Sequence, residues 1–311
     1  MRQLLRQIFQ RSTHDIKHAL QWLSTSSSQC PFCGKGLSRT LLSPSSQHFE
    51  GAQAYLSYLP SSFTQTVCST CQATIPWLTP IKCRICGRGI ACTDCIRRTD
   101  ARFIANRSAV RYSSEMREWL AQYKYRGNER LEKQLAQMML PAFAAITKEA
   151  ASRTRTSSQT AGNSSTTTSF WDAITFVPVS MERAEERGFN QAERLASFLS
   201  GHHHIPLYDL LIRQRHTEKQ SFKTRFERMK DTRRLFQAKP ETMALLHTSF
   251  SNPLMNEFGK TNVGITPSRP IRLLLIDDIY TTGSTIQACS TALHEQASIS
   301  IEIYALTWAR S

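Results

Sequence analysis

Two adjacent acidic residues followed by a cluster of hydroxyl side chains form the stretch of this chain with the clearest chemistry. Asp277 and Asp278 end an apolar run, and a Thr-Thr-Gly-Ser-Thr segment begins after two further residues. Carboxylates accept hydrogen bonds from the two hydroxyls of a ribose, and a small turn before a helix binds phosphate through its backbone N–H groups. The spacing therefore predicts a site for a ribose 5-phosphate. The predicted phosphate-binding residues are Thr281, Thr282, Gly283, Ser284 and Thr285.

A buried strand and a helix are needed to position these residues. Leu273–Ile276 is apolar throughout, which is typical of a parallel strand that is covered on both faces and whose carboxyl end opens onto a crevice. Ile286–Leu293 is expected to form the helix that follows. An ordinary strand-turn-helix would not require the acids and the threonines together, and the glycine patterns of P-loops and dinucleotide-binding turns are absent.

A second strand is expected to end in a cationic loop. Trp171–Val179 reads as a buried strand, and two arginines and a glycine follow it before a helix at Glu193–Leu199. Such a loop suits an anionic ligand. The basic run 213–239 fits a mobile lid over pyrophosphate, a second DNA surface or a solvated helix. The residues assigned to the pyrophosphate loop and the lid are Arg183, Arg187, Gly188, Arg215 and Lys219.

Eight of the nine cysteines form four Cys-x-x-Cys pairs between residues 30 and 95. Paired thiolates at this spacing can ligate one tetrahedral metal, so we predict two structural four-cysteine zinc sites, with iron–sulfur ligation as the alternative. Gly34 and Gly87 follow the second cysteine of a pair, as expected of a tight metal-binding turn. We favour sequential pairing of the four motifs into two sites over interleaved pairing, although the spacing alone does not decide between them. The predicted ligands are Cys30, Cys33, Cys68, Cys71, Cys83, Cys86, Cys92 and Cys95.

The composition indicates a globular protein with a basic first half. The chain has 311 residues, 40% of them apolar, and no run long enough to span a membrane, so we expect a cytoplasmic protein. Residues 1–170 hold 22 basic and 9 acidic side chains, whereas residues 171–311 hold 17 and 15. Most of the net charge of +15 therefore lies in the first half. Nucleic acid is the expected partner of that half, and a solubilising surface is the alternative.

Three regions are expected along the chain. Residues 1–29 show the spacing of basic amphipathic helices, residues 30–100 are expected to form a double zinc-ribbon domain, and residues 101–311 an α/β domain with a parallel sheet. Polar composition predicts flexible insertions in this last domain near 151–169 and 237–268. Strands are predicted at 103–112 and 299–307, and helices at 114–123 and 129–148.

Taken together, these segments resemble the ComF family of bacterial competence proteins, in which a zinc-ribbon region is fused to a type I phosphoribosyltransferase domain. The resemblance covers nearly the whole chain except the two insertions. Besides the four cysteine pairs, it is carried by Tyr123-Lys-Tyr-Arg-Gly127, Val177-Pro-Val179, Glu186-Arg-Gly-Phe-Asn-Gln191, Arg215-x-Thr217-x-x-Gln220, Arg228 and Leu273–Thr285.

This resemblance implies a site for phosphoribosyl pyrophosphate (PRPP). Asp277 and Asp278 would contact the ribose hydroxyls, residues 281–285 the 5-phosphate, and the loop after Val179 the pyrophosphate, with Mg²⁺ bridging it to the ribose. The family further implies handling of single-stranded DNA in the cytoplasm during natural transformation, with other competence or DNA-processing proteins as partners.

Two further functions stay open at this point. The first is an active phosphoribosyltransferase that transfers ribose 5-phosphate from PRPP to an unknown nitrogen acceptor, although no acceptor-specificity loop is recognisable. The second is a scaffold with a vestigial pocket, which the intact Asp-Asp and Thr-Thr-Gly-Ser-Thr segments argue against.

Overall fold

The structure is a computed structural model in which the chain forms two compact units. The smaller unit comprises residues 1–45 and 61–73, and the larger unit comprises residues 46–60 and 74–311. The described residues are 29–37, 56–98, 100–125, 130–155, 170–214, 235–251 and 269–311. The predicted N-terminal helices lie outside the described residues, apart from Gln29.

Two short helices and a cysteine cluster form the described part of the smaller unit. The helices are α3 (Ser61–Thr66) and α4 (Ser69–Thr74). The side chain of Gln72 on α4 donates hydrogen bonds to the backbone oxygens of Thr64 (3.0 Å) and Val67 (2.6 Å), and so ties the two helices together. A small unit of this kind has little apolar core, which makes a structural metal an expected source of stability.

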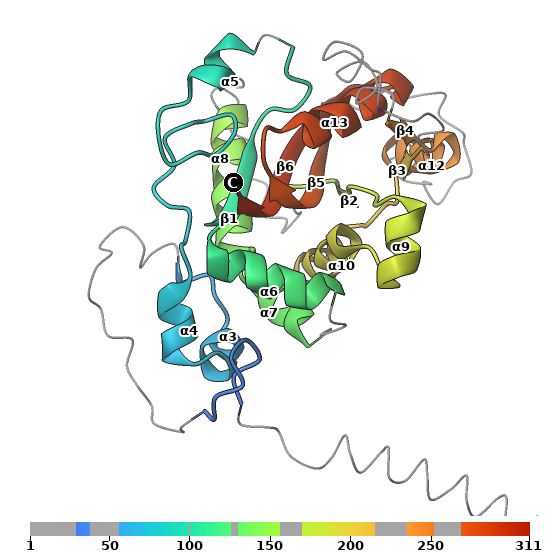
Figure 1. Ribbon diagram of the computed structural model, residues 1–311. Coiled ribbons are helices and arrows are strands. Elements are labelled where there is room, and N and C mark those ends of the chain that lie inside the picture. Colours follow the sequence, from blue (N-terminus) through green and yellow to red (C-terminus); the bar gives the residue numbers. More distant parts are fainter. Residues whose placement is uncertain are drawn as a thin grey trace, which may run out of the picture. The chain divides into compact units, whose positions relative to one another are not determined.

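A four-stranded sheet lies at the centre of the larger unit (Figure 1), and all of its strand pairs are parallel. The order is β1-β6-β5-β2, and the strands are β1 (Asn106–Arg111), β2 (Ala173–Phe176), β5 (Ile271–Tyr280) and β6 (Ile301–Arg310). The predicted α/β fold with a parallel sheet is confirmed. The segment Leu273–Ile276 is completely buried, as its continuous apolar character indicated.

Strand β5 is longer than the sequence predicted. It continues through both acids to Tyr280 because it stays paired with β6, where Asp277 lies opposite Thr307. Its other neighbour, β2, ends opposite Ile276. The acids therefore lie just beyond the end of β2, where one side of β5 becomes available to a ligand.

Helices surround this sheet (Figure 1). They are α6 (Ser114–Tyr125), α7 (Leu131–Gln137), α8 (Leu140–Arg155), α9 (Met181–Arg187), α10 (Gln191–His203), α12 (Pro240–Ser251) and α13 (Ser284–Gln296). None of the described helices is long and apolar enough to cross a membrane.

The single helix predicted at 129–148 is wrong, because the chain forms α7 and α8 instead. Pro141 is the reason: a proline lacks the N–H group that a helix interior needs, but it is tolerated in the first turn. Helix α8 therefore begins at Leu140. It ends at Arg155, so the first five residues of the predicted insertion 151–169 are helical, and residues 156–169 lie outside the described part of the chain.

The other predicted insertion, 237–268, also contains regular structure. A two-stranded antiparallel sheet joins β3 (Leu211–Arg213) to β4 (Phe236–Ala238), and α12 follows with Met243 and Leu246 buried. The spacing of these apolar side chains is helical. Residues 252–268 lie outside the described residues.

The second group of cysteines, with the short helix α5 (Thr93–Arg97), packs on the sheet of the larger unit. The backbone N–H of Asn106 on β1 donates to the oxygen of Ile85 (2.6 Å), and Arg107 donates to the oxygen of Arg84 (3.1 Å). The contacts in the structure thus group residues 83–95 with the α/β unit, whereas the predicted boundary near residue 100 places them with the first cysteines.

Candidate functional site

The two adjacent acids differ in their surroundings. Asp277 is only 8% exposed, and burial together with the neighbouring negative charge of Asp278 raises the pKa of Asp277 well above its usual value. The positive charge of Lys124 and a hydrogen bond from the backbone N–H of Asp278 to Asp277 Oδ1 (2.8 Å) act in the opposite direction. The site thus holds one strongly desolvated acid beside a more accessible one.

Lys124 brings a distant motif to these acids. Its ammonium group forms an ion pair with the carboxylate of Asp278. The preceding residue, Tyr123, is buried and packs its ring on that of Phe189, with 5.1 Å between the ring centroids. The segments that contain Tyr123, Phe189 and Asp278 are far apart in the sequence but meet at one place in the larger unit.

Asn190 fixes the turn that carries Phe189. Its side-chain nitrogen donates to the backbone oxygen of Val177 (3.1 Å), just after β2, and its side-chain oxygen accepts from the N–H of Ala192 (3.0 Å) at the start of α10. Asn190 is thus both an anchor and a helix cap, the role for which asparagine is well suited.

The predicted loop after Val179 is wrong in one respect, because it contains helix α9. Ser180 caps this helix by accepting a hydrogen bond from the N–H of Arg183 (3.4 Å), and Gly188 ends it in the left-handed conformation. Arg183 and Arg187 are therefore placed by a helix, and Arg187 donates to the side chain of Gln191 (2.8 Å). Serine is a typical residue at the start of a helix and glycine at its end, so the positions of Ser180 and Gly188 were a local signal for this helix.

Arg213 on β3 is a cation that the predicted site residues did not include. Burial lowers the pKa of Arg213, and the nearby positive charge of Arg183 lowers it further, whereas the negative charge of Asp277 raises it. Arg213 is therefore electrostatically coupled both to α9 and to the end of β5. The predicted lid residues Arg215 and Lys219 lie outside the described residues.

Gly283 gives the Thr-Thr-Gly-Ser-Thr turn its shape. Its φ of 80° is left-handed, and a Cβ at this position would lie 2.1 Å from the hydroxyl of Tyr280. Only glycine fits here without displacing the tyrosine. Thr281, Thr282 and Ser284 are exposed, and α13 begins at Ser284, so the hydroxyl-rich turn is open to a ligand.

Arg98, which the sequence patterns did not indicate, holds the backbone of this turn. Its guanidinium donates to the backbone oxygen of Thr282 (3.1 Å). The segment after it is held on α13, because Gln287 donates to the oxygen of Asp100 (2.6 Å) and accepts from the N–H of Arg102 (3.0 Å). No local pattern indicates these contacts, which join residues 184 or more positions apart.

Both groups of four cysteines have the geometry of metal sites. In each group the sulfurs lie within 4.8 Å of one another, and none of the cysteines forms a disulfide. Cys33 and Cys68 have their sulfurs 3.6 Å apart, and Cys86 and Cys92 3.8 Å apart. A zinc tetrathiolate with 2.3 Å bonds has an edge of about 3.8 Å, so zinc fits both groups.

The grouping confirms sequential pairing of the four Cys-x-x-Cys motifs. It joins Cys30, Cys33, Cys68 and Cys71 in the smaller unit, and Cys83, Cys86, Cys92 and Cys95 in the larger unit. The glycines after Cys33 and Cys86 have φ values of 73° and 72°, as expected of tight metal-binding turns. The first cluster is partly open, with Cys33 exposed, whereas all four cysteines of the second are buried.

Comparison with known proteins agrees with these motifs. The chain is 28% identical over 241 residues to the competence protein ComFC of Bacillus subtilis (strain 168), a match that covers 75% of this chain and 79% of the relative. The chain is similar to ComFC. It is also 25% identical over 244 residues to the competence protein ComFC of Streptococcus pneumoniae (strain ATCC BAA-255 / R6), covering 77% of this chain and 86% of the relative. No family model matches the chain.

Both of these relatives are named competence proteins. Three of the motifs that carried the ComF resemblance meet in the structure, since Lys124 pairs with Asp278 and the ring of Tyr123 packs at a tilt against that of Phe189. Asn190 then connects this group to Val177 at the end of β2.

Proposed function

We propose that the protein acts in DNA uptake during natural transformation, where it binds and handles single-stranded DNA, and that it binds PRPP with Mg²⁺ at the ends of β2 and β5. The observation that carries the PRPP part is the ion pair between Lys124 and Asp278, beside the open turn at residues 281–285. The similarity to ComFC competence proteins supports the role in DNA uptake.

Each part of the proposed site suits one part of PRPP. The carboxylates of Asp277 and Asp278 would accept hydrogen bonds from the ribose hydroxyls, and the turn would donate backbone N–H groups to the 5-phosphate. Arg183, Arg187 and Arg213 supply positive charge for the pyrophosphate. Magnesium, when bound, would neutralise part of the negative charge of the pyrophosphate. Lys124 limits the repulsion between the two acids and the anionic ligand.

The basic residues of the first half would supply the contacts to single-stranded DNA. This half carries 13 of the 15 excess positive charges. Contacts between cations and phosphates release counterions, so DNA binding through this region must weaken steeply as salt is added. The two four-cysteine sites would hold structural zinc, because four thiolates leave no open coordination position for catalysis.

Transfer of ribose 5-phosphate from PRPP to a nitrogen acceptor is a second candidate function. It is favoured by the buried Asp277, since an acid with a raised pKa next to a reacting sugar can hold or release a proton. Pyrophosphate release that depends on an added nitrogen acceptor would establish this activity. PRPP binding without pyrophosphate release would leave PRPP as an effector.

Titration of the zinc-loaded protein with a fluorescent single-stranded oligonucleotide, with and without PRPP and Mg²⁺, tests the proposal. We expect affinity that falls steeply between 50 and 200 mM salt, by roughly a factor of ten or more. A change in DNA affinity on addition of PRPP would show that the two ligands are linked. Absence of DNA binding, or binding that is indifferent to salt, would contradict the DNA-handling function.

A further inference from the structure

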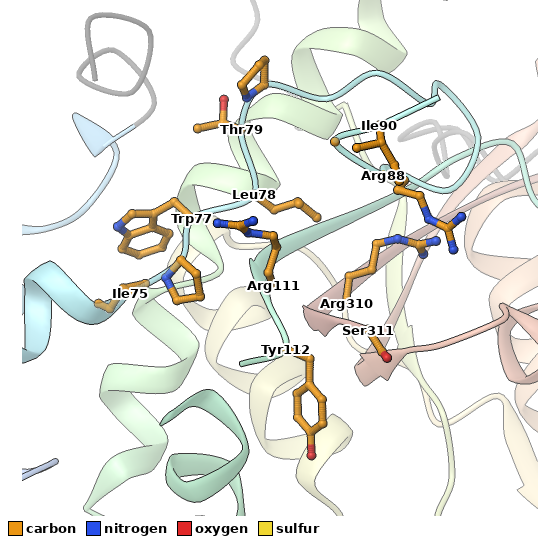
Figure 2. Close-up of a pocket in the computed structure, with 13 residues that line it drawn as sticks. Ile75, Trp77, Leu78, Thr79, Arg88, Ile90, Arg111, Tyr112, Arg310 and Ser311 are labelled. Atoms are coloured by element: carbon orange, nitrogen blue, oxygen red, sulfur yellow. The ribbon is translucent and has the colours of Figure 1, made fainter. Parts of the chain in front are cut away.

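A pocket of about 630 Å³ lies at the carboxyl ends of β1 and β6 in the larger unit (Figure 2). Its walls include two aromatic side chains, Trp77 and Tyr112, and three arginines, Arg88, Arg111 and Arg310. Its size is that of pockets that hold small organic ligands. Ligands of open parallel sheets bind at this edge, beyond the carboxyl ends of the strands.

The backbone around this pocket is held firmly in place. The segment that carries Trp77 runs antiparallel to β1, with hydrogen bonds from Leu78 N–H to Ala109 oxygen (3.0 Å) and from Arg111 N–H to Pro76 oxygen (2.9 Å). The N–H of Tyr112 donates to the oxygen of Arg310 on β6 (2.7 Å). A pocket built on paired strands in this way has a preformed shape, which lowers the cost of ordering on binding.

Arg310 is the residue that points to a ligand. Its side chain is 5% exposed, and its Nε and Nη1 atoms have no hydrogen-bond partner among the described residues. Figure 2 shows the side chains of Arg310 and Arg88 pointing toward one another. None of the described residues that line the pocket is an aspartate or a glutamate, although Asp94, outside this lining, forms an ion pair with Arg88 (3.8 Å). Buried guanidinium nitrogens without a hydrogen-bond partner are costly, and an anion bound at Arg310 would reduce this cost.

The second cysteine cluster accounts for only part of this positive charge. Arg88 Nη1 lies 3.9 Å from Cys92 Sγ, and Arg310 interacts electrostatically with Cys86. A zinc tetrathiolate would therefore attract both arginines. Each guanidinium nevertheless has five N–H donors, so one edge can face the thiolates while another faces the pocket. The cluster also does not explain the two aromatic side chains that line the pocket or the exposed Arg111.

We propose that this pocket binds one nucleotide of single-stranded DNA, with a phosphate at Arg88 and Arg310 and the base stacked on Trp77 or Tyr112. Stacking on aromatic side chains combined with arginine contacts is how proteins hold single strands without reading their sequence. The choice of single-stranded DNA as ligand rests on the proposed function, whereas the inference that the pocket binds an anion does not.

The pocket is distinct from the proposed PRPP site, and Tyr280 connects the two. Arg310 lies over one face of the Tyr280 ring, 4.6 Å from its centroid, while the hydroxyl of the same tyrosine fills the space beside Gly283. Tyr280 thus touches both Arg310, which lines the pocket, and Gly283 of the phosphate-binding turn.

Photocrosslinking locates the DNA on the zinc-loaded protein. A single-stranded oligothymidylate that contains 5-iododeoxyuridine is irradiated on the protein, and the modified residues are identified by mass spectrometry. We expect crosslinks at Trp77 or Tyr112. Crosslinks confined to other parts of a DNA-bound protein would overturn the pocket while leaving the proposed function intact, and absence of DNA binding would contradict the proposed function itself.

Affinity measurements on variants provide an independent readout. We expect Trp77→Leu to weaken oligothymidylate binding about tenfold and Arg111→Gln to reduce its salt dependence. Arg117→Gln, an equal loss of charge at an exposed position on α6, is the matched control and should have a smaller effect. Equal affinity of all three variants would overturn the proposal. Binding of thymidine monophosphate without binding of the oligonucleotide would also overturn it, in favour of a free nucleotide.

Variants must first be shown to fold. Arg111→Gln changes an exposed side chain, so its thermal unfolding and zinc content should match those of the unmodified protein. If Trp77→Leu unfolds, Arg111→Gln and the crosslinking experiment still decide the question.

Discussion

The ammonium group of Lys124 pairs with the carboxylate of Asp278, and this ion pair joins helix α6 to the end of β5. Both side chains are largely shielded from solvent, with exposed fractions of 13% and 20%. The pair therefore offsets part of the negative charge of the two acids at the proposed PRPP site. Without Lys124, Asp278 would face an anionic ligand without its ion-pair partner.

We predict that Lys124→Met weakens PRPP binding by roughly tenfold or more, the usual effect of losing a charge-assisted hydrogen bond. Lys133→Met is the control, because Lys133 is exposed on α7 and its loss removes the same charge elsewhere. Isothermal titration with PRPP and Mg²⁺ measures both. Equal affinities of the two variants would show that the ion pair has no role in binding.

Gly283→Ala should damage the phosphate-binding turn. The added Cβ would collide with the Tyr280 hydroxyl, and the left-handed φ disfavours alanine, so we expect a loss of roughly 1–3 kcal/mol in the free energy of unfolding together with loss of PRPP binding. Gly201→Ala in α10 has open space around its Cβ and should stabilise the helix by about 1 kcal/mol. Denaturant titrations of both variants measure this contrast, and unfolding midpoints that shift in the same direction would contradict it.

Asp277 is expected to make the stability of the protein depend on pH. Its pKa in the folded protein is raised, so the folded state holds this proton more tightly than the unfolded state, and stability falls as the pH rises above the ordinary value of 3.8. Asp277→Asn removes the charge. We predict that this variant is more stable than the unmodified protein at neutral pH and that the difference shrinks toward pH 5. Thermal unfolding across this range tests the sign.

The two metal sites should respond differently to a chelator. The first cluster has the exposed Cys33, so we expect its metal to leave first, whereas the second is buried against the sheet. Loss of the second metal should also loosen the phosphate-binding turn, because Arg98 follows that cluster and donates to Thr282. Metal release followed in time, together with hydrogen exchange, measures both effects. Simultaneous release, with exchange at residues 281–287 unchanged, would contradict this coupling.

The strongest predictions from sequence came from local patterns. The apolar run before Asp277 specified a buried strand, and the spacing of the cysteines specified two metal-binding groups whose sequential pairing the structure confirms. The acids with their turn and each Cys-x-x-Cys pair are formed by residues close together in the chain, so local patterns indicated them, whereas the pairing of the motifs joins Cys33 to Cys68 and needed the structure.

The remaining features depend on contacts between distant segments. The hydrogen bond from Arg98 to Thr282 and the ion pair between Lys124 and Asp278 follow from how helices pack on the sheet, which periodicity does not specify. Two local signals were also missed. Pro141 divides the predicted helix 129–148, and Ser180 with Gly188 bounds the short helix α9.

Titration of the zinc-loaded protein with PRPP and Mg²⁺ tests the central claim most directly, when the unmodified protein is compared with the Asp277→Asn/Asp278→Asn double variant. Both proteins should stay folded, since amides replace the acids without a change in size. We predict saturable binding of PRPP to the unmodified protein and its loss in the double variant. Unchanged binding in the double variant, or no binding by the unmodified protein, would contradict a PRPP site at the end of β5.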